Sequence, residues 1–148
     1  MKAVSYLKKN GLRHTLNVIY SYKIDVAIQK LMQVFLKKRP LQDIIVIESH
    51  NDFDSNGGAF YNYLIQNEYN KKYKIIWLIK HNESLNVQLP QNVDYVMQYK
   101  PSFKKNYYKW LAKWLTADND CSDKLRDDQI SIYFGHGGFG LKNCKGYI

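Results

Sequence analysis

The sequence lacks the features that mark several common protein classes. Its 148 residues include 2 cysteines, 3 prolines and 8 glycines, too few for a disulfide scaffold, a low-complexity tract or a collagen-like chain. Cys121 and Cys144 show neither CxxC spacing nor a neighbouring histidine at metal-ligand spacing, so they are expected to be reduced cytosolic thiols. No apolar run approaches the roughly 20 residues of a membrane span, and the N-terminus lacks the apolar stretch of a signal peptide.

Acidic residues are almost missing from the first quarter of the chain. Residues 1–40 contain nine lysines and arginines but one acidic residue, Asp25, which gives that quarter a net charge of +8. The rest of the chain carries +1, and 45% of all residues are hydrophobic, enough for the core of one domain. A basic segment on a near-neutral body indicates an anionic partner, either lipid headgroups or nucleic acid.

Residues 14–38 have the spacing of a long helix. One apolar stripe recurs every three or four residues, and three lysines repeat every seven residues along its flank: Leu16, Tyr20, Ile24, Ile28, Leu31 and Phe35, with Lys23, Lys30 and Lys37. Such a helix could lie in a headgroup layer with its lysines reaching the water, or it could pack on its own domain. Residues 1–40 are thus expected to form a basic amphipathic segment, ended by Pro40, and the spacing leaves both environments open.

After Pro40 the pattern becomes one of short buried strands alternating with helices. We expect strands at 43–48, 73–79, 94–97 and 129–134, and helices at 59–69 and 102–115. This alternation predicts an α/β fold for residues 41–148, a Rossmann-like parallel sheet with flanking helices. Because ligands of such sheets bind beyond the carboxyl ends of the strands, the loops at 49–58 and 135–142 are the expected site.

The second of these loops concentrates glycine around one histidine. Four of the eight glycines lie between residues 135 and 140, where bare backbone could approach an anion closely. His136, followed by Gly137, could act as a general base, and Lys142 could neutralise a phosphate. Neither nucleotide-binding glycine fingerprint is present, and a tight turn whose histidine only caps a helix is the alternative.

The first loop is polar. Glu48, His50, Asp52 and Asp54 alternate as metal ligands could, but alternation on a loop does not bring side chains together, so no metal is expected. We interpret His50 and its neighbours as a polar rim. Asn56 and Gly57 belong to a predicted turn into the next helix, whose N-terminus could receive an anion.

Lysines and aromatic residues alternate through residues 100–114. Such a mixture could stack on single-stranded nucleic acid, sit at a membrane interface, or be half core and half solvated surface. Because no recognised nucleic-acid-binding motif accompanies it, no nucleic acid partner is expected.

Three ordered segments, residues 44–80, 100–120 and 125–142, resemble the CDP-glycerol glycerophosphotransferase family, which builds teichoic acids and related polyol-phosphate polymers. They are similar to its first strand with an ES-containing loop and a Trp-bearing second strand, to its Tyr- and Lys-rich helix leading to a short strand, and to its "Q-strand-HG…K" segment. The third segment departs from the usual pattern, because Lys142 follows the His-Gly pair one residue later than in the family.

The resemblance implies the N-terminal, acceptor-side half of a two-domain GT-B enzyme, peripheral on the cytoplasmic face of the bacterial plasma membrane. It therefore favours contact of residues 1–40 with an anionic membrane surface. It implies no cofactor, CDP-glycerol or another CDP-polyol as donor, and a lipid-linked polyol-phosphate acceptor in teichoic acid or capsule synthesis. His136, beside Gly137, would be the general base, and Lys142, Asn56, Gly57 and His50 would contact substrate or phosphate. A donor-binding second half has no counterpart in these 148 residues, so a non-catalytic membrane-binding module or a truncated remnant is the alternative.

Overall fold

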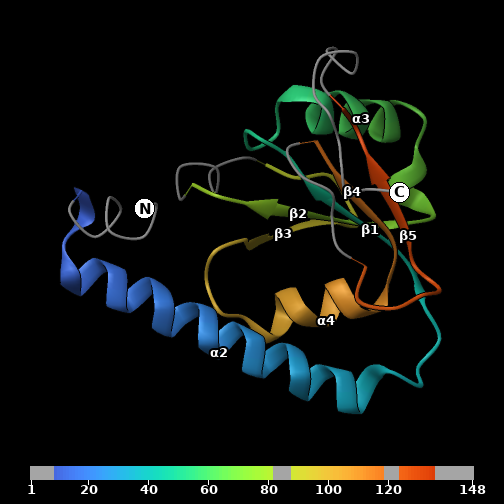
Figure 1. Cartoon of the computed structure of the whole chain (residues 1–148). Helices are drawn as coiled ribbons and strands as arrows, with labels where there is room; N and C mark the ends of the chain where they lie inside the picture. The colour runs from blue at the N-terminus through green and yellow to red at the C-terminus, as the bar shows by residue number, and fades with distance from the viewer. Residues whose placement is uncertain (1–8, 82–87, 119–123, 136–148) are drawn as a thin grey trace.

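The computed structural model describes residues 9–81, 88–118 and 124–135, and it confirms the predicted Rossmann-like α/β fold (Figure 1). Five parallel strands form one sheet in the order β3-β2-β1-β4-β5. The elements run along the chain as α2 (Leu12–Leu36), β1 (Gln42–Glu48), α3 (Ser55–Gln66), the short 3-10 helix η1 (Tyr69–Lys71), β2 (Lys74–Ile79), β3 (Val93–Met97), α4 (Phe103–Leu111), β4 (Ala112–Ala117) and β5 (Ile130–Tyr133).

The central strands are buried on both faces because β-branched and aromatic residues occupy consecutive positions in them. In the register of the sheet, Ile45 of β1 lies beside Ile75 of β2 on one side and Trp114 of β4 on the other. Alternate residues of each strand therefore feed two separate cores, one on each face of the sheet.

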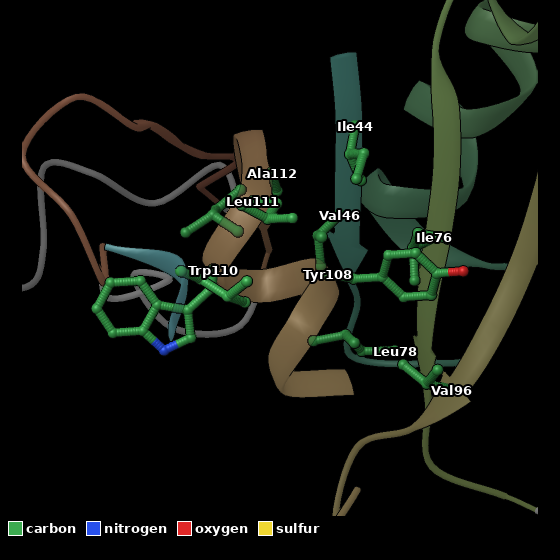
Figure 2. Packing of buried hydrophobic residues seen from close by; sticks show 11 residues of the cluster. Ile44, Val46, Ile76, Leu78, Val96, Tyr108, Trp110, Leu111 and Ala112 are labelled. Carbon is green, nitrogen blue, oxygen red and sulfur yellow. The ribbon is translucent and has the colours of Figure 1, made fainter. Parts of the chain in front are cut away.

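The core on one face lies between the sheet and α4, with α2 packed outside α4 (Figure 1). Figure 2 shows Tyr108 reaching from α4 toward Ile76 of β2, while Trp110 points to the opposite side of the helix. Leu36 and the partly buried Met32 bring the C-terminal half of α2 into the same cluster. α2 is therefore joined to the sheet through α4.

The core on the other face is covered by α3. Leu64 of α3 packs with Ile45, Ile47 and Ile75 of the sheet. At the edge of this core the indole of Trp77 meets two aromatic rings, with centroid distances of 4.8 Å to Phe53 and 5.5 Å to Tyr61. The contact of Phe53 with Trp77 thus fixes the loop after β1 against this core.

The expected helix over 102–115 is wrong in its last four residues. The helix ends at Leu111, and residues 112–117 form β4, paired with both β1 and β5. Trp114, expected on the helical stripe with Trp110, instead faces the α3 side and meets Tyr73 edge-on at 4.9 Å. Helical spacing and a buried strand are both compatible with this short apolar run, and pairing with β1 decides between them.

The bounds of α3 are shifted as well, from the expected 59–69 to Ser55–Gln66. α3 begins at Ser55, so Asn56, Gly57 and Gly58 lie in its first turn and not in the turn that the sequence predicted before a helix at 59. α2 begins and ends two residues earlier than expected. The remaining predicted strands are each within one residue of those observed.

The apolar stripe expected on α2 divides between two faces. Ile28 is buried and Ile24 half-buried against the domain, whereas Leu16, Tyr20, Leu31 and Phe35 are exposed. The helix is apolar on more than one side, and the face that packs on α4 is centred on Ile28, Met32 and Leu36. Within the residues described, no helix is both long and apolar enough to cross a bilayer.

Candidate functional site

The site lies where β1 and β4 end side by side. The chain runs outward from β1 through β2 to β3, and then returns to place β4 on the other side of β1. In parallel sheets ligands bind at this kind of switch point, beyond the carboxyl ends of the strands. Here β1 leads into Ser49 and His50, and β4 leads into Asp118.

Asp118 organises this end of the sheet. The side chain is fully buried, and its two oxygens accept hydrogen bonds from Ser49 Oγ at 2.6 Å, from the His50 backbone N–H at 2.6 Å and from the Gly57 backbone N–H at 3.1 Å. Ser49 Oγ also lies 2.8 Å from the Asp54 carbonyl oxygen. One carboxylate thus fixes the loop after β1 and the first turn of α3 against the end of β4.

Two glycines let α3 approach this closely. A Cβ atom at Gly57 would lie 2.7 Å from Ser49 Cβ, and one at Gly58 would lie 2.7 Å from the Phe53 carbonyl oxygen. The same loop holds Phe53 and Ser55 at φ of 59° and 62°, in the left-handed region that side chains seldom adopt. Strained backbone of this kind is often found at functional sites.

The Gly57 amide, which the sequence assigned to a substrate phosphate, already donates to Asp118. That amide at the start of α3 therefore holds a carboxylate of the protein itself. The bond gives Gly57 a structural role in this arrangement.

Asn56 connects α3 to the far side of the site. Its Nδ2 lies 3.4 Å from the carbonyl oxygen of Phe134 and 3.5 Å from that of Gly135, immediately after β5. The Phe134 ring also packs on Phe60 of α3, at a centroid distance of 5.0 Å. The fold thereby brings Asn56 beside the residue that precedes His136 in the sequence; His136, Gly137 and Lys142 themselves lie outside the described residues.

His50 lies at the rim, with its side chain exposed. Its backbone N–H donates to Asp118, and its carbonyl oxygen accepts from Lys80 Nζ at 3.2 Å. The structure therefore brings His50, Asn56 and Gly57 together around the ends of β1 and β4.

The alternating acidic residues of the first loop point to different places. Glu48 accepts a hydrogen bond from Gln98, whereas Asp52 accepts from the backbone N–H groups of Lys80 and His81 at 2.8 and 2.9 Å. Across the described parts of the chain, no three His, Cys, Asp or Glu side chains gather as a metal site would need.

Sequence reasoning missed Asp118 and Ser49. Asp118 follows β4, whose first four residues the helical spacing assigned to a helix. The family resemblance implied a short strand after that helix but not where the strand ends. Recognising Ala112–Ala117 as a strand would have placed a carboxylate directly after it, which is the signal for a residue at the carboxyl edge.

The lysines of residues 100–113 do not form one exposed surface. Lys105 is buried and pairs with Asp25 at 2.7 Å, Lys104 pairs with Asp94 at 2.7 Å, and Lys113 lies over the Trp114 ring. The interpretation as half core and half solvated surface fits this arrangement.

Comparison with known proteins gives matches to solved structures only. Neither a protein-family model nor a curated protein matches this sequence. The wall teichoic acid polymerase TagF matches over 83% of this chain and 30% of its own, with 18% identity and a TM-score of 0.56. A histidine-to-asparagine variant of TagF soaked with CDPG matches over the same shares, with 19% identity and a TM-score of 0.57.

This chain thus spans less than a third of the TagF chains that it matches. At this level of identity the likeness concerns the fold. It agrees with the family resemblance of the three sequence segments and with the predicted part of a GT-B structure. The chain has the Rossmann-like α/β fold found in part of the wall teichoic acid polymerase TagF.

Proposed function

We propose that this chain is the N-terminal, acceptor-side part of a CDP-glycerol or other CDP-polyol glycerophosphotransferase. Such an enzyme would act on a lipid-linked acceptor at the cytoplasmic face of the plasma membrane. The observation that carries the proposal is the convergence of Asn56, His50 and the end of β5 around the Asp118-bound loop. The fold shared with TagF supports the same reading.

In the proposed reaction an acceptor hydroxyl attacks the β-phosphorus of the CDP-polyol. An oxygen–phosphorus bond forms, the bond to the CMP oxygen breaks, and CMP leaves with the electron pair. His136 takes the proton of the attacking hydroxyl, as a base with a pKa near the working pH can do. Lys142 offsets phosphate charge, and Asn56, next in space to Gly135, contributes a polar group at the same edge.

The test is CMP release by the longest natural protein that contains this sequence. His136→Ala is expected to lower the turnover of a CDP-polyol at least 100-fold, because a general base contributes about that much or more. His81→Ala is the matched control: His81 is exposed and bonds to Asp52 at the other side of the loop. Near-normal turnover in His136→Ala would remove that residue from the mechanism.

One observation favours a second function, binding to an anionic membrane surface. On α2 the apolar side chains of Leu16, Tyr20, Leu31, Val34 and Phe35 are 45–68% exposed. Lys23 and Lys30 follow one flank of this apolar face, and Lys37 continues that row as the residue that caps the C-terminus of the helix. Apolar side chains and adjacent lysines suit a surface with acyl chains below and phosphates above.

Co-sedimentation with vesicles tests this second function. Binding to anionic vesicles is expected to weaken as the salt concentration rises, because dissolved ions screen the attraction between the lysines of α2 and the lipid phosphates. The double variant Leu31→Ser and Phe35→Ser should lose most of the binding, whereas Tyr63→Ser, which removes an exposed ring from α3 on the opposite face, should keep it. Equal binding by both variants would contradict a role for α2.

A further inference from the structure

An apolar groove of about 190 Å³ lies beside α3, over the outer strands of the sheet. It is lined by Phe60 and Leu64 of α3, by Tyr73 before β2, by Trp114 of β4 and by Ile132 of β5. Tyr73 and Trp114 lie near the amino ends of their strands, so the groove is separate from the candidate site at the carboxyl ends. A cavity of about 590 Å³, between α2 and Tyr99, lies on the opposite face (Figure 1).

The outer end of the sheet is poorly covered on the α3 face. Trp114 belongs to the core on this face, and its register partner in β5 is Ile130, which therefore points the same way. Ile130 is 46% exposed, whereas Ile47 and Ile75 of the central strands are fully buried in that core. Parallel sheets are normally covered by helices on both faces. Over β4 and β5 the described residues do not complete this cover.

A row of aromatic rings runs along one side of the groove. Tyr63, Tyr69 and Tyr73 follow one another at centroid distances of 6.1 Å, and Tyr73 meets Trp114 at 4.9 Å. Tyr63 and Tyr69 are 53% and 37% exposed. Aromatic residues are enriched in protein interfaces, because each ring offers a large contact area at a low cost in side-chain entropy. The row therefore extends the apolar surface that a partner can contact.

Two lysines border the groove. Lys72 Nζ lies 5.1 Å from the Tyr73 ring centroid, and Lys113 Nζ lies 4.7 Å from the Trp114 ring centroid. Neither lysine forms an ion pair with a carboxylate in the described ranges. A hydrogen bond with Tyr73 and, to a smaller extent, the charge of Asp43 raise the pKa of Lys72, so its ammonium group stays charged at neutral pH. The border of the groove is therefore positive.

We propose that this groove binds an amphipathic helix of a partner protein that carries acidic residues beside its apolar stripe. The apolar stripe lies on Trp114 and Ile132 next to α3, and the carboxylates reach Lys72 and Lys113. Such a helix supplies both the cover that the sheet lacks there and the charge opposite to that of the two lysines.

The α2 helix of a second copy does not fit this description. Residues 1–40 contain nine lysines and arginines and one acidic residue, so α2 would bring positive charge to a positive border. The proposal depends neither on transfer chemistry at His136 nor on membrane contact of α2, so each can fail without the others.

The test is an NMR titration of the ¹⁵N-labelled chain with a synthetic amphipathic helix that has leucines at i, i+3, i+4 and i+7 and glutamates on both flanks. A peptide with lysine in place of each glutamate is the matched comparator. The glutamate peptide is expected to give saturable shifts at the Trp114 indole and at the amides of Ile130 and Ile132, with a Kd at least tenfold lower than that of the lysine peptide. The absence of such shifts, or equal affinity of the two peptides, would overturn the proposal.

Variants test the role of the two lysines. Lys72→Gln combined with Lys113→Gln should raise the Kd for the glutamate peptide at least tenfold. Lys71→Gln is the matched control, because Lys71 is an adjacent exposed lysine that already pairs with Glu68, and it should leave the Kd unchanged. All three lysines are exposed, so these variants leave the core intact. An unchanged Kd in the double variant would overturn the proposal.

The same double variant distinguishes a partner helix from a membrane surface, which lysines and aromatic rings can also contact. It should co-sediment with anionic vesicles as the unchanged protein does. A loss of vesicle binding as large as the loss of peptide binding would assign the groove to a membrane surface and overturn the proposal.

Discussion

Asp118 is a single carboxylate that holds three donors from two other segments of the chain, the loop after β1 and the first turn of α3. Because it is fully buried, the carboxylate depends on these donors to replace the water that it loses. The geometry of the candidate site therefore depends on one residue that need not touch substrate.

Replacement of Asp118 by Asn is expected to lower the free energy of unfolding by about 3 kcal/mol. The amide nitrogen of Asn would face at least one of the backbone N–H groups of His50 and Gly57, so a buried donor would lose its partner. Urea denaturation measures the change. The control is Asp127→Asn, at an exposed position before β5, which should shift the midpoint little. Equal midpoints for the two variants would contradict the role given to Asp118.

Tyr61 gives the structure a pH dependence on the alkaline side. Burial beside Trp77 raises the pKa of Tyr61 above its ordinary value of 10.0. Above pH 10 the unfolded chain releases this proton more readily than the folded chain, so stability falls as pH rises through the folded-state pKa. Urea midpoints at pH 9 and pH 11 should differ less in Tyr61→Phe than in the unchanged protein. The same loss in both would exclude this tyrosine as the source.

For single residues, the sequence could predict which loop would carry polar side chains, but not which contacts across the fold those residues would make. The polar loop after β1 was identifiable because it follows a strongly apolar run, and His50, Asn56 and Gly57 do gather there. The role of Gly57 was not identifiable, because its need for bare backbone arises from Ser49 at the end of β1, a contact across the fold.

Among the elements, α2 is held by a polar anchor as well as by its apolar face. The only acidic residue of the first forty, Asp25, pairs with buried Lys105 and accepts from Asn106 Nδ2 and the Ser102 backbone N–H at the start of α4. The one acidic residue of that segment thus has a structural role, because it lies where α2 meets α4.

The isosteric change Asp25→Asn should cost about 3 kcal/mol, because Lys105 would keep a buried charge without its partner. Asp94→Asn provides the matched control, since its Lys104 partner is half exposed and such pairs contribute less than about 1 kcal/mol. Hydrogen exchange of α2 amides, measured with the urea midpoint, should show loosening of α2 in Asp25→Asn alone. Equal effects in both variants would refute the anchor.

Elements were predictable where one pattern excluded the other. The β-branched runs of β1 and β2 fit a buried strand and not an amphipathic helix. The pattern of residues 103–117, in contrast, fits both a helical stripe and a buried strand. The division is fixed by tertiary contacts: buried Gln129 donates from Nε2 to the carbonyl oxygens of Lys109 at 2.7 Å and Ala112 at 2.9 Å, at the junction of α4 and β4. A propensity argument does not include such a contact.

At the scale of the whole molecule, the parallel sheet places two distinct features near its carboxyl edge. One face carries the Asp118-bound loop and Asn56, and the other carries the cavity between α2 and Tyr99. The fold class and the position of the first feature followed from strand and loop order, because parallel strands end at a common edge. The position of the cavity could not be predicted from the order of strands and loops, because it depends on how α2 packs against α4.

The most direct measurement of the central proposal is CMP release from CDP-glycerol by the longest natural protein containing this sequence, with and without a lipid-linked polyol-phosphate acceptor. The account predicts acceptor-dependent release of CMP, one for each polyol phosphate transferred, from CDP-glycerol or from another CDP-polyol. A folded protein that binds anionic vesicles but releases no CMP from any CDP-polyol would contradict it and would leave membrane binding as the function.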